Sequence, residues 1–384
     1  MQPTRPLLRS RSPFIAALLA LSLTATAAWA ERPAGEVLSH KAGVPWPAVI
    51  AHRGLSFNAP EETLPAFIAA RDLGADYLEM DLQRTKDGVL IALHDDKLTR
   101  TTNVGQVFPE RAEQPVNTFT LAELKQLDAG SWFNQAFPEQ ARPGFAGLKI
   151  LTLDEVIDIA EGGANKPGLY LETKVPAQFP GIEKDLQALL QKRGWLWAVS
   201  APDGFDATQH NGTGYSAGRV VLQTFDKASL TLLNQAMPQA PKILLLWLGD
   251  GAIEVKDATS YASSGAKDKA EYYGMLEVKD RATYAQWLDF AKANGATGVG
   301  PATKLKNGGE FSYMDMTQPW MNQMAHEKGL FIHPYTVNDA VDFKAVAGVD
   351  GFFTNRADQL LAFYHRAAKQ SADEVLTQAG YPKP

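Results

Sequence analysis

Histidine, arginine and acidic residues stand at positions in the first half of the chain where they could support proton transfer around a bound cation. His52 and Arg53 directly follow the apolar run Ala48-Val49-Ile50-Ala51, and His94 ends another apolar run. Strand ends of this kind are where α/β folds display their active groups. Histidine exchanges protons near neutral pH, and arginine offers a planar set of donors that suits a phosphate. Taken alone, a histidine at the end of a strand is more often an ordinary loop residue than a catalytic one.

Acidic side chains alternate with apolar ones in two short segments of the chain. Side chains of a strand point alternately to its two faces, so Glu79 and Asp81 would share one face of a strand, as would Glu172 and Lys174 on another. Buried carboxylates are costly without a compensating cation, and oxygen ligands suit Mg²⁺ or Ca²⁺. The three acids could therefore bind one metal ion, with Lys174 neutralising a phosphate oxygen. An amphipathic strand with its acids in water and an internal salt bridge are the alternatives.

After its first thirty residues the chain alternates short apolar runs with longer helical patterns, which is typical of a parallel α/β fold. The expected strands are 48–51, 77–82, 89–93, 169–171, 220–223, 243–248, 297–299, 330–335 and 351–353. The expected helices are 63–73, 153–161, 181–192, 281–294, 317–328 and 357–368. The stretches expected to form long loops or small insertions are 103–118, 134–149 and 195–219.

Nine apolar runs compete for the eight strand places of a barrel. Asp87-Gly88 is a tight-turn signal between two of the runs, so we expect a hairpin across residues 77–93. One run is then extra to the barrel. Periodicity alone does not separate such a barrel from a doubly wound open sheet, and both architectures stay open at this point.

The first thirty residues are typical of an export signal. Arginines precede the apolar stretch 14–23, which is too short to span a bilayer comfortably, and Ala28-Trp29-Ala30 fits a small-x-small cleavage pattern. We therefore expect a secreted protein without stable membrane insertion, with the periplasm favoured over the medium. Residues 31–384 are expected to form a single domain.

The composition excludes several classes of function. The chain has no cysteine, which excludes thiol nucleophiles and thiolate metal sites. Its formal net charge is −6 and no basic stripe is present, so no nucleic-acid partner is expected. The same acidity gives no long-range attraction for an anionic substrate, so any phosphate must be captured by local positive charge. The oligomeric state stays open.

The order of these motifs resembles the glycerophosphodiester phosphodiesterase family. The resembling segments are His52-Arg53-Gly54, Pro60-Glu61-Glu62-Thr63, Gly74-Ala75-Asp76, Glu79-Met80-Asp81, Thr85-Lys86-Asp87-Gly88, His94-Asp95, Leu98-Thr99-Arg100-Thr101-Thr102, Leu127-Asp128-Ala129-Gly130-Ser131-Trp132, Leu171-Glu172-Thr173-Lys174, Tyr335-Thr336-Val337-Asn338 and Asp350-Gly351-Phe352-Phe353-Thr354-Asn355. They are dense in the N-terminal half, whereas residues 195–320 match poorly.

Three residues depart from the family pattern. Glu62 stands where Asn is usual and adds a negative charge near the expected site. Thr173 stands where Leu is usual, and it is expected to face away from the barrel interior. Tyr335 stands where Trp is frequent. His333 shares a strand face with Phe331 and Tyr335, and for His333 both simple packing and contact with substrate stay open.

The resemblance implies a TIM-like (β/α)8 barrel with loop insertions that hydrolyses glycerophosphodiesters to glycerol 3-phosphate and an alcohol. It implies that His52 and His94 form an acid–base pair. It implies that one divalent metal, commonly Ca²⁺ or Mg²⁺, is bound by Glu79, Asp81 and Glu172. The groups that it implies for binding substrate or phosphate are Arg53, Lys174 and Tyr335. Which histidine acts first as base stays open. The alternatives are a phospholipase acting on lysophospholipids or phosphoinositides with the same barrel, an inactive binding protein, and a sugar hydrolase.

Overall fold

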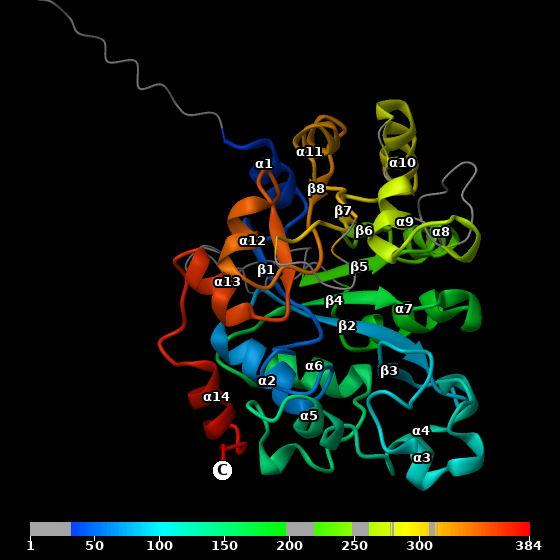
Figure 1. Cartoon of the computed structure of the whole chain (residues 1–384), viewed down its shortest axis with the longest axis vertical. Coiled ribbons are helices and arrows are strands. Elements are labelled where there is room, and N and C mark those ends of the chain that lie inside the picture. The colour runs from blue at the N-terminus through cyan, green and yellow to red at the C-terminus, as the bar shows by residue number, and fades with distance from the viewer. Residues whose placement is uncertain are drawn as a thin grey trace, which may run out of the picture. The chain divides into compact units, whose positions relative to one another are not determined.

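The computed structural model describes residues 32–196, 219–247, 261–276, 278, 280–306, 312 and 314–384. The expected export signal, residues 1–30, and most of the expected loop 195–219 lie outside the described residues. Residues Pro33–Pro384 form one compact unit, which Figure 1 colours from blue at α1 to red at α14. Within the described ranges, no helix combines the length and the apolar character needed to cross a membrane.

Within the described residues, eight parallel strands form a nearly closed barrel, in the order β8-β7-β6-β5-β4-β2-β1-β9. The strands are β1 (Ala48–Ala51), β2 (Tyr77–Arg84), β4 (Gly168–Thr173), β5 (Val220–Thr224), β6 (Lys242–Leu246), β7 (Gly298–Pro301), β8 (Phe331–Ile332) and β9 (Gly351–Thr354). The two ends of this order meet, because Asp350 N–H donates to Ile332 O at 2.8 Å and Phe353 N–H donates to Pro334 O at 3.1 Å. The barrel prediction is confirmed, and the open sheet is wrong.

The ninth strand belongs to the expected hairpin. Strand β3 (Leu90–Ala92) pairs antiparallel with the end of β2, with Gln83 opposite Ile91. Gly88 at the turn has φ +87°, a conformation that glycine adopts without steric cost. The hairpin extends past the barrel and returns the chain towards the carboxyl ends of the strands (Figure 1). We call that end of the barrel its mouth.

A helix lies between most consecutive barrel strands, and another follows the last strand. These helices are α2 (Leu64–Leu73), α6 (Leu153–Gly162), α7 (Ile182–Lys192), α8 (Lys227–Ala236), α10 (Arg281–Ala293), α11 (Pro319–Glu327), α12 (Ala340–Ala345) and α13 (Ala357–Phe363). Helix α6 begins with a capping box in which Thr152 and Glu155 satisfy each other's backbone N–H groups. Helix α2 ends at Gly74, which has φ +98°.

Further helices lie outside this repeating pattern: α1 (Ala34–Lys41), α3 (Val104–Val107), α4 (Leu121–Leu124), α5 (Ser131–Ala136), α9 (Lys269–Leu276) and α14 (Ala372–Gln378). The expected loop 103–118 therefore contains a short helix. The prediction of a helix over 357–368 was too long, because α13 ends at Phe363 and His365 takes φ +58°. This turn brings Arg366 to Asp76, where its Nη2 donates to Oδ1 at 2.6 Å.

The barrel interior holds a packed apolar cluster beneath the mouth. We call it the floor, and it includes one side chain from each of seven strands: Ile50, Tyr77, Tyr170, Val221, Ile243, Phe331 and Phe353. Leu78, Met80 and Leu82 instead pack with the helices outside the barrel, which confirms the expected alternation along β2. Thr173 also faces outwards as expected, and its hydroxyl lies 2.9 Å from that of Ser229 on α8.

His333 is packed in the interior. Its side chain is fully buried and its Nδ1 lies 3.1 Å from the Tyr170 hydroxyl. Its ring lies 4.8 Å from the ring of Phe331, centroid to centroid. The structure thus shows His333 packed with the floor, and its Nε2 has no hydrogen-bond partner among the described residues.

Candidate active site

Three carboxylates meet inside the barrel just above the floor. Within the described residues, Glu79, Asp81 and Glu172 each offer an oxygen that lies within 4.8 Å of the other two. All three are at most 5% exposed. The sheet register explains the meeting, because β2 and β4 are parallel neighbours and Asp81 stands directly opposite Glu172. Three buried oxygen donors at this spacing fit a divalent cation such as Ca²⁺ or Mg²⁺.

The carboxylates strongly affect one another's ionisation. Burial and the charges of Asp81 and Glu172 raise the pKa of Glu79 well above its usual value. Burial raises the pKa of Glu172 to about 7, although Lys174 opposes the shift. For Asp81 burial is outweighed by surrounding positive charge, chiefly from Lys174, and its pKa is lowered. Burial and mutual repulsion therefore oppose the ionisation of two of the three carboxyl groups, Glu79 and Glu172. A cation bound among them would relieve this repulsion.

Two basic side chains border the carboxylates. Lys174 Nζ lies 3.2 Å from Glu172 Oε1 and 3.6 Å from Asp81 Oδ1. Arg53 Nε lies 3.2 Å from Asp81 Oδ2. The backbone of Arg53 has φ +55°, and its N–H donates to Glu79 Oε2 at 2.8 Å. A left-handed conformation is uncommon for arginine and is typical of backbone constrained at functional sites.

His52 lies at the mouth directly after β1. Its backbone N–H donates to Thr354 O at 2.9 Å, and its Nδ1 lies 2.7 Å from Asn355 Oδ1. An amide oxygen only accepts hydrogen bonds, so Nδ1 carries the proton and Nε2 keeps a free lone pair. Burial and the charge of Arg53 lower the pKa of His52 to about 3, so its imidazole is neutral at physiological pH.

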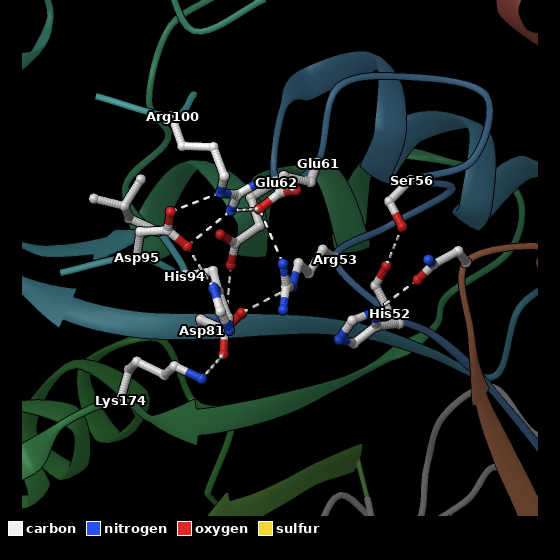
Figure 2. A network of polar contacts seen from close by, with 12 residues as sticks. His52, Arg53, Ser56, Glu61, Glu62, Asp81, His94, Asp95, Arg100 and Lys174 are labelled. Atoms are coloured by element: carbon white, nitrogen blue, oxygen red, sulfur yellow. Dashed lines mark hydrogen bonds and ion pairs between the residues drawn. The ribbon is translucent and has the colours of Figure 1, made fainter. Parts of the chain in front are cut away.

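His94 lies after β3, on the return arm of the hairpin, and faces a carboxylate instead of an amide. Its Nδ1 lies 2.6 Å from Asp95 Oδ1. Gln83 fixes this loop, because its Nε2 donates to the carbonyls of Leu93 at 2.7 Å and of Asp95 at 2.6 Å. Figure 2 shows His94 beside Asp81, with a dashed line joining its ring to Asp95. A carboxylate at Nδ1 accepts a hydrogen bond from that ring nitrogen, so Asp95 fixes the tautomer and the orientation of the His94 imidazole.

A chain of ion pairs connects His94 with Arg53 (Figure 2). Arg100 donates to both oxygens of Asp95, at 2.6 and 2.8 Å, and to both oxygens of Glu61, at 2.9 and 2.7 Å. Glu61 in turn accepts from Arg53 Nη1 at 3.0 Å. Burial opposes the ionisation of Glu61, but Arg53 and Arg100 outweigh it and lower its pKa to about 2. Sequence reasoning placed Glu61, Asp95 and Arg100 in motifs and gave none of them this role.

Glu62 takes the place where the family usually has Asn. Its φ is +56°, in the left-handed region that Asn tolerates better than other residues with side chains. It is 4% exposed, and its Oε1 accepts the backbone N–H of Asp81 at 2.7 Å. Burial and the charge of Asp81 raise its pKa well above the usual value. The Glu62 carboxyl group, which was expected near the site, therefore contacts the backbone of Asp81, a candidate metal ligand.

Tyr335 stands among aromatic side chains at the mouth. Its hydroxyl donates to Leu246 O at 3.1 Å, and its ring is nearly perpendicular to that of Phe225, with centroids 5.7 Å apart. The Phe225 ring centroid is 5.8 Å from Lys174 Nζ. The structure thus places Tyr335 on the same side of the barrel as the other expected site residues.

The comparisons with known proteins agree with this geometry. Residues 52–359 match the model of the glycerophosphoryl diester phosphodiesterase family. The glycerophosphodiester phosphodiesterase of Bacillus subtilis (strain 168) is 37% identical over 322 residues, which are 83% of this chain and 86% of that protein. A glycerophosphodiester phosphodiesterase of Arabidopsis thaliana is 28% identical over 80% of this chain and 83% of that protein.

A solved structure shares the fold. It is a phosphodiesterase of Oleispira antarctica in complex with the product sn-glycerol-3-phosphate, with a TM-score of 0.56 and 22% identity. The match covers 83% of this chain and 97% of that one. At this identity the likeness supports the barrel, while the sequence matches carry the assignment of the family. This chain belongs to the glycerophosphodiester phosphodiesterase family and is a phosphoric diester hydrolase.

Proposed function

We propose that this enzyme hydrolyses glycerophosphodiesters to glycerol 3-phosphate and an alcohol with the help of one divalent metal ion, Ca²⁺ or Mg²⁺. Glu79, Asp81 and Glu172 would hold the ion. The observation that carries this proposal is the meeting of their three buried carboxylates within 4.8 Å. A bound metal ion would supply positive charge to the phosphoryl oxygens as negative charge grows on them.

Arg53 and Lys174 are proposed to bind the phosphate. Both basic groups lie within 3.6 Å of the same carboxylates, so they border the place where the metal ion would bind. Lys174 is partly exposed at the mouth, and Arg53 offers further N–H groups besides the one that donates to Glu61. Tyr335 is proposed to line the substrate site beside them.

The hydrogen-bond partners of the two histidines support different roles. His52 is proposed to be the base, because its Nδ1 donates to the Asn355 amide oxygen and leaves the Nε2 lone pair free. His94 is proposed to be the acid, because the displacement needs a second proton-transfer group and Asp95 holds the His94 ring in place through Nδ1. In the proposed reaction His52 takes the proton of the glycerol 2-hydroxyl, and the resulting oxygen attacks phosphorus. The bond from phosphorus to the alcohol oxygen breaks, and His94 protonates that oxygen.

The proposed first product is a cyclic phosphate, which water opens in a second step. His94, now neutral, takes a proton from the water, and His52 returns its proton to the glycerol oxygen as the ring opens. Both imidazoles then have their starting protonation states, so the cycle is balanced. The glycerol 3-phosphate left by this sequence is the product bound in the Oleispira antarctica phosphodiesterase.

The proposal is tested with protein stripped of metal by a chelator and then dialysed. Glycerophosphocholine, glycerophosphoinositol and lysophosphatidylcholine are assayed separately, with Ca²⁺, Mg²⁺ and Mn²⁺ added back one at a time. Release of glycerol 3-phosphate from a glycerophosphodiester only when metal is present is the expected result. Full activity without metal would contradict the metal site, and preferential hydrolysis of the lysolipid would favour the phospholipase alternative.

We also propose that the protein is exported, on the basis of the charged start, apolar stretch and small-x-small pattern in its first thirty residues. Expression of the full-length gene in a bacterium, followed by cell fractionation and N-terminal sequencing, tests this proposal. Mature protein that begins after Ala30 in the periplasm or the medium is expected. Uncleaved protein in the cytoplasm would overturn it.

A further inference from the structure

Gln223 is a polar side chain inside the barrel to which sequence reasoning assigned no role. It lies on β5, two residues after Val221 of the floor, and is 1% exposed. Because β5 and β4 are parallel neighbours, Gln223 stands directly opposite Glu172. It therefore points into the same part of the barrel as the three carboxylates.

The amide of Gln223 has a fixed orientation. Its Nε2 donates to Glu79 Oε1 at 3.0 Å, and the other oxygen of Glu79 accepts the N–H of Arg53 at 2.8 Å. The opposite orientation of the amide would place two oxygens against each other, so the contact with Glu79 decides which end of the amide is nitrogen. Gln223 and Arg53 together hold the Glu79 carboxylate from both sides.

The oxygen of the same amide has no hydrogen-bond partner among the described residues. Gln223 Oε1 is buried and accepts no hydrogen bond, and Asp81 Oδ2 in the neighbouring carboxylate accepts none either, although it lies 3.2 Å from Arg53 Nε. Leaving a buried acceptor unsatisfied lowers stability, and an ion or an ordered water is a common partner for such groups in native proteins.

We propose that Gln223 is a further part of the divalent-metal site: its Nε2 holds Glu79 in place, and its Oε1 supplies a fourth protein oxygen to the cation. This inference rests on the proposed function, because it needs the ion between Glu79, Asp81 and Glu172. Amide oxygens are ordinary ligands of Ca²⁺, which takes six to eight oxygens, whereas Mg²⁺ keeps more of its own waters. Gln223 should consequently contribute more to the binding of Ca²⁺ than of Mg²⁺.

The test measures Ca²⁺ and Mg²⁺ affinity of the metal-stripped protein by titration calorimetry, with no substrate present. Gln223→Met removes both polar atoms at similar volume and is expected to weaken Ca²⁺ binding about ten- to a hundredfold, with a smaller loss for Mg²⁺. Gln223→Glu keeps an oxygen at the same place and is expected to bind Ca²⁺ at least ten times more tightly than Gln223→Met. The matched control is Gln187→Met, which removes a partly buried amide that donates to Ala236 O outside the barrel, and it should bind as the wild type.

Two results would overturn the assignment of Gln223. One is Ca²⁺ affinity of Gln223→Met within twofold of the wild type, and the other is Gln223→Glu binding as weakly as Gln223→Met. If Gln223→Met does not fold, the comparison of Gln223→Glu with the wild type decides, since a carboxylate facing the ion should at least preserve the affinity. Glu172→Gln separates this inference from the proposed function. A wild type without a metal site, or Glu172→Gln with unchanged affinity, would contradict the three-carboxylate site itself.

Discussion

The floor and the mouth of the barrel are built from the same strands and differ in the polarity and charge of their buried side chains. On β2 the floor residue Tyr77 is followed on the same face by Glu79 and Asp81, and on β4 Tyr170 is followed by Glu172. In the floor the Tyr77 and Tyr170 rings pack edge to face with centroids 5.5 Å apart. Two residues further along each strand stand Glu79 and Glu172, and burial together with the charges of Asp81 and Glu172 raises the pKa of Glu79. On each strand, the side chain that packs in the floor and the next side chain on the same face, which is acidic, are thus only two residues apart.

This difference indicates where stability and activity should respond separately to mutation. Floor side chains are buried among apolar neighbours, so their removal leaves a cavity and lowers the free energy of unfolding. The mouth carries buried acids whose ionisation opposes folding until a cation compensates them. Changes at the mouth should therefore alter activity and metal binding with little loss of stability, and changes in the floor should do the reverse.

Removal of either imidazole gives the largest effect expected at the mouth. His52→Ala and His94→Ala should each lower kcat by about 10² to 10⁴, because a proton-transfer group is lost. The melting temperature of each variant should stay close to that of the wild type. Steady-state kinetics with glycerophosphocholine and a thermal melt check both statements. Near-normal turnover in His94→Ala would remove that residue from the mechanism.

Truncation of a floor side chain should lower the stability of the protein and leave its activity largely unchanged. Phe353 is 2% exposed and its ring lies 4.9 Å from that of Tyr170. Phe353→Ala should lower the free energy of unfolding by about 3–5 kcal/mol. Denaturant titration measures this loss, and the kcat of the folded fraction should change less than tenfold. A stable but inactive Phe353→Ala protein would contradict the assignment of stability to the floor and of activity to the mouth.

Arg100 should matter through the groups it holds. Arg100→Met leaves Asp95 and Glu61 without their shared partner, so kcat should fall by about ten- to a hundredfold, less than when His94 itself is removed. Arg100→Lys should recover part of the loss, since it restores the charge without the paired geometry. The pH profile of kcat gives an independent readout, because it should change when Asp95, the hydrogen-bond partner of His94 Nδ1, is no longer held by Arg100. A loss of stability with unchanged kinetics would reduce Arg100 to a structural role.

Much of this architecture follows from local patterns in the sequence. The nine strands and the hairpin are predictable because apolar runs, β periodicity and Asp87-Gly88 are short-range signals. Glu79 and Glu172 come together because side chains alternate along each strand and because β2 and β4 are parallel neighbours. The short helices in expected loops were missed because segments of four residues, such as α3, carry too little periodicity to recognise.

The parts that sequence reasoning missed depend on contacts distant along the chain. Arg100 reaches Glu61 across 39 positions, and Gln223 reaches Glu79 across 144. Only the folding of the hairpin and the order of the strands bring these residues together. The premature end of α13 has the same origin, since Arg366 leaves the helical path to pair with the buried Asp76, 290 residues earlier.

The smallest expected effect is a pH dependence of stability in the metal-free protein. In the folded protein burial raises the pKa of Glu172 to about 7, above the usual 4.5 of a glutamate. The folded protein then binds more protons than the unfolded chain between these values, so stability falls as the pH rises from 4.5 to 7. With a chelator present, the melting temperature of the wild type should fall more between pH 5 and pH 7.5 than that of Glu172→Gln. Identical pH dependence in the two proteins would contradict this contribution.

The central claim is that three carboxylates share one cation at the mouth of the barrel. Crystals soaked in Mn²⁺ and measured for anomalous scattering test it most directly. The account predicts a single strong peak bounded by Glu79, Asp81 and Glu172, at about 2.0–2.6 Å from their oxygens, as for hard cations of this kind. A crystal whose only peaks lie elsewhere, at a manganese concentration that supports full activity, would contradict it.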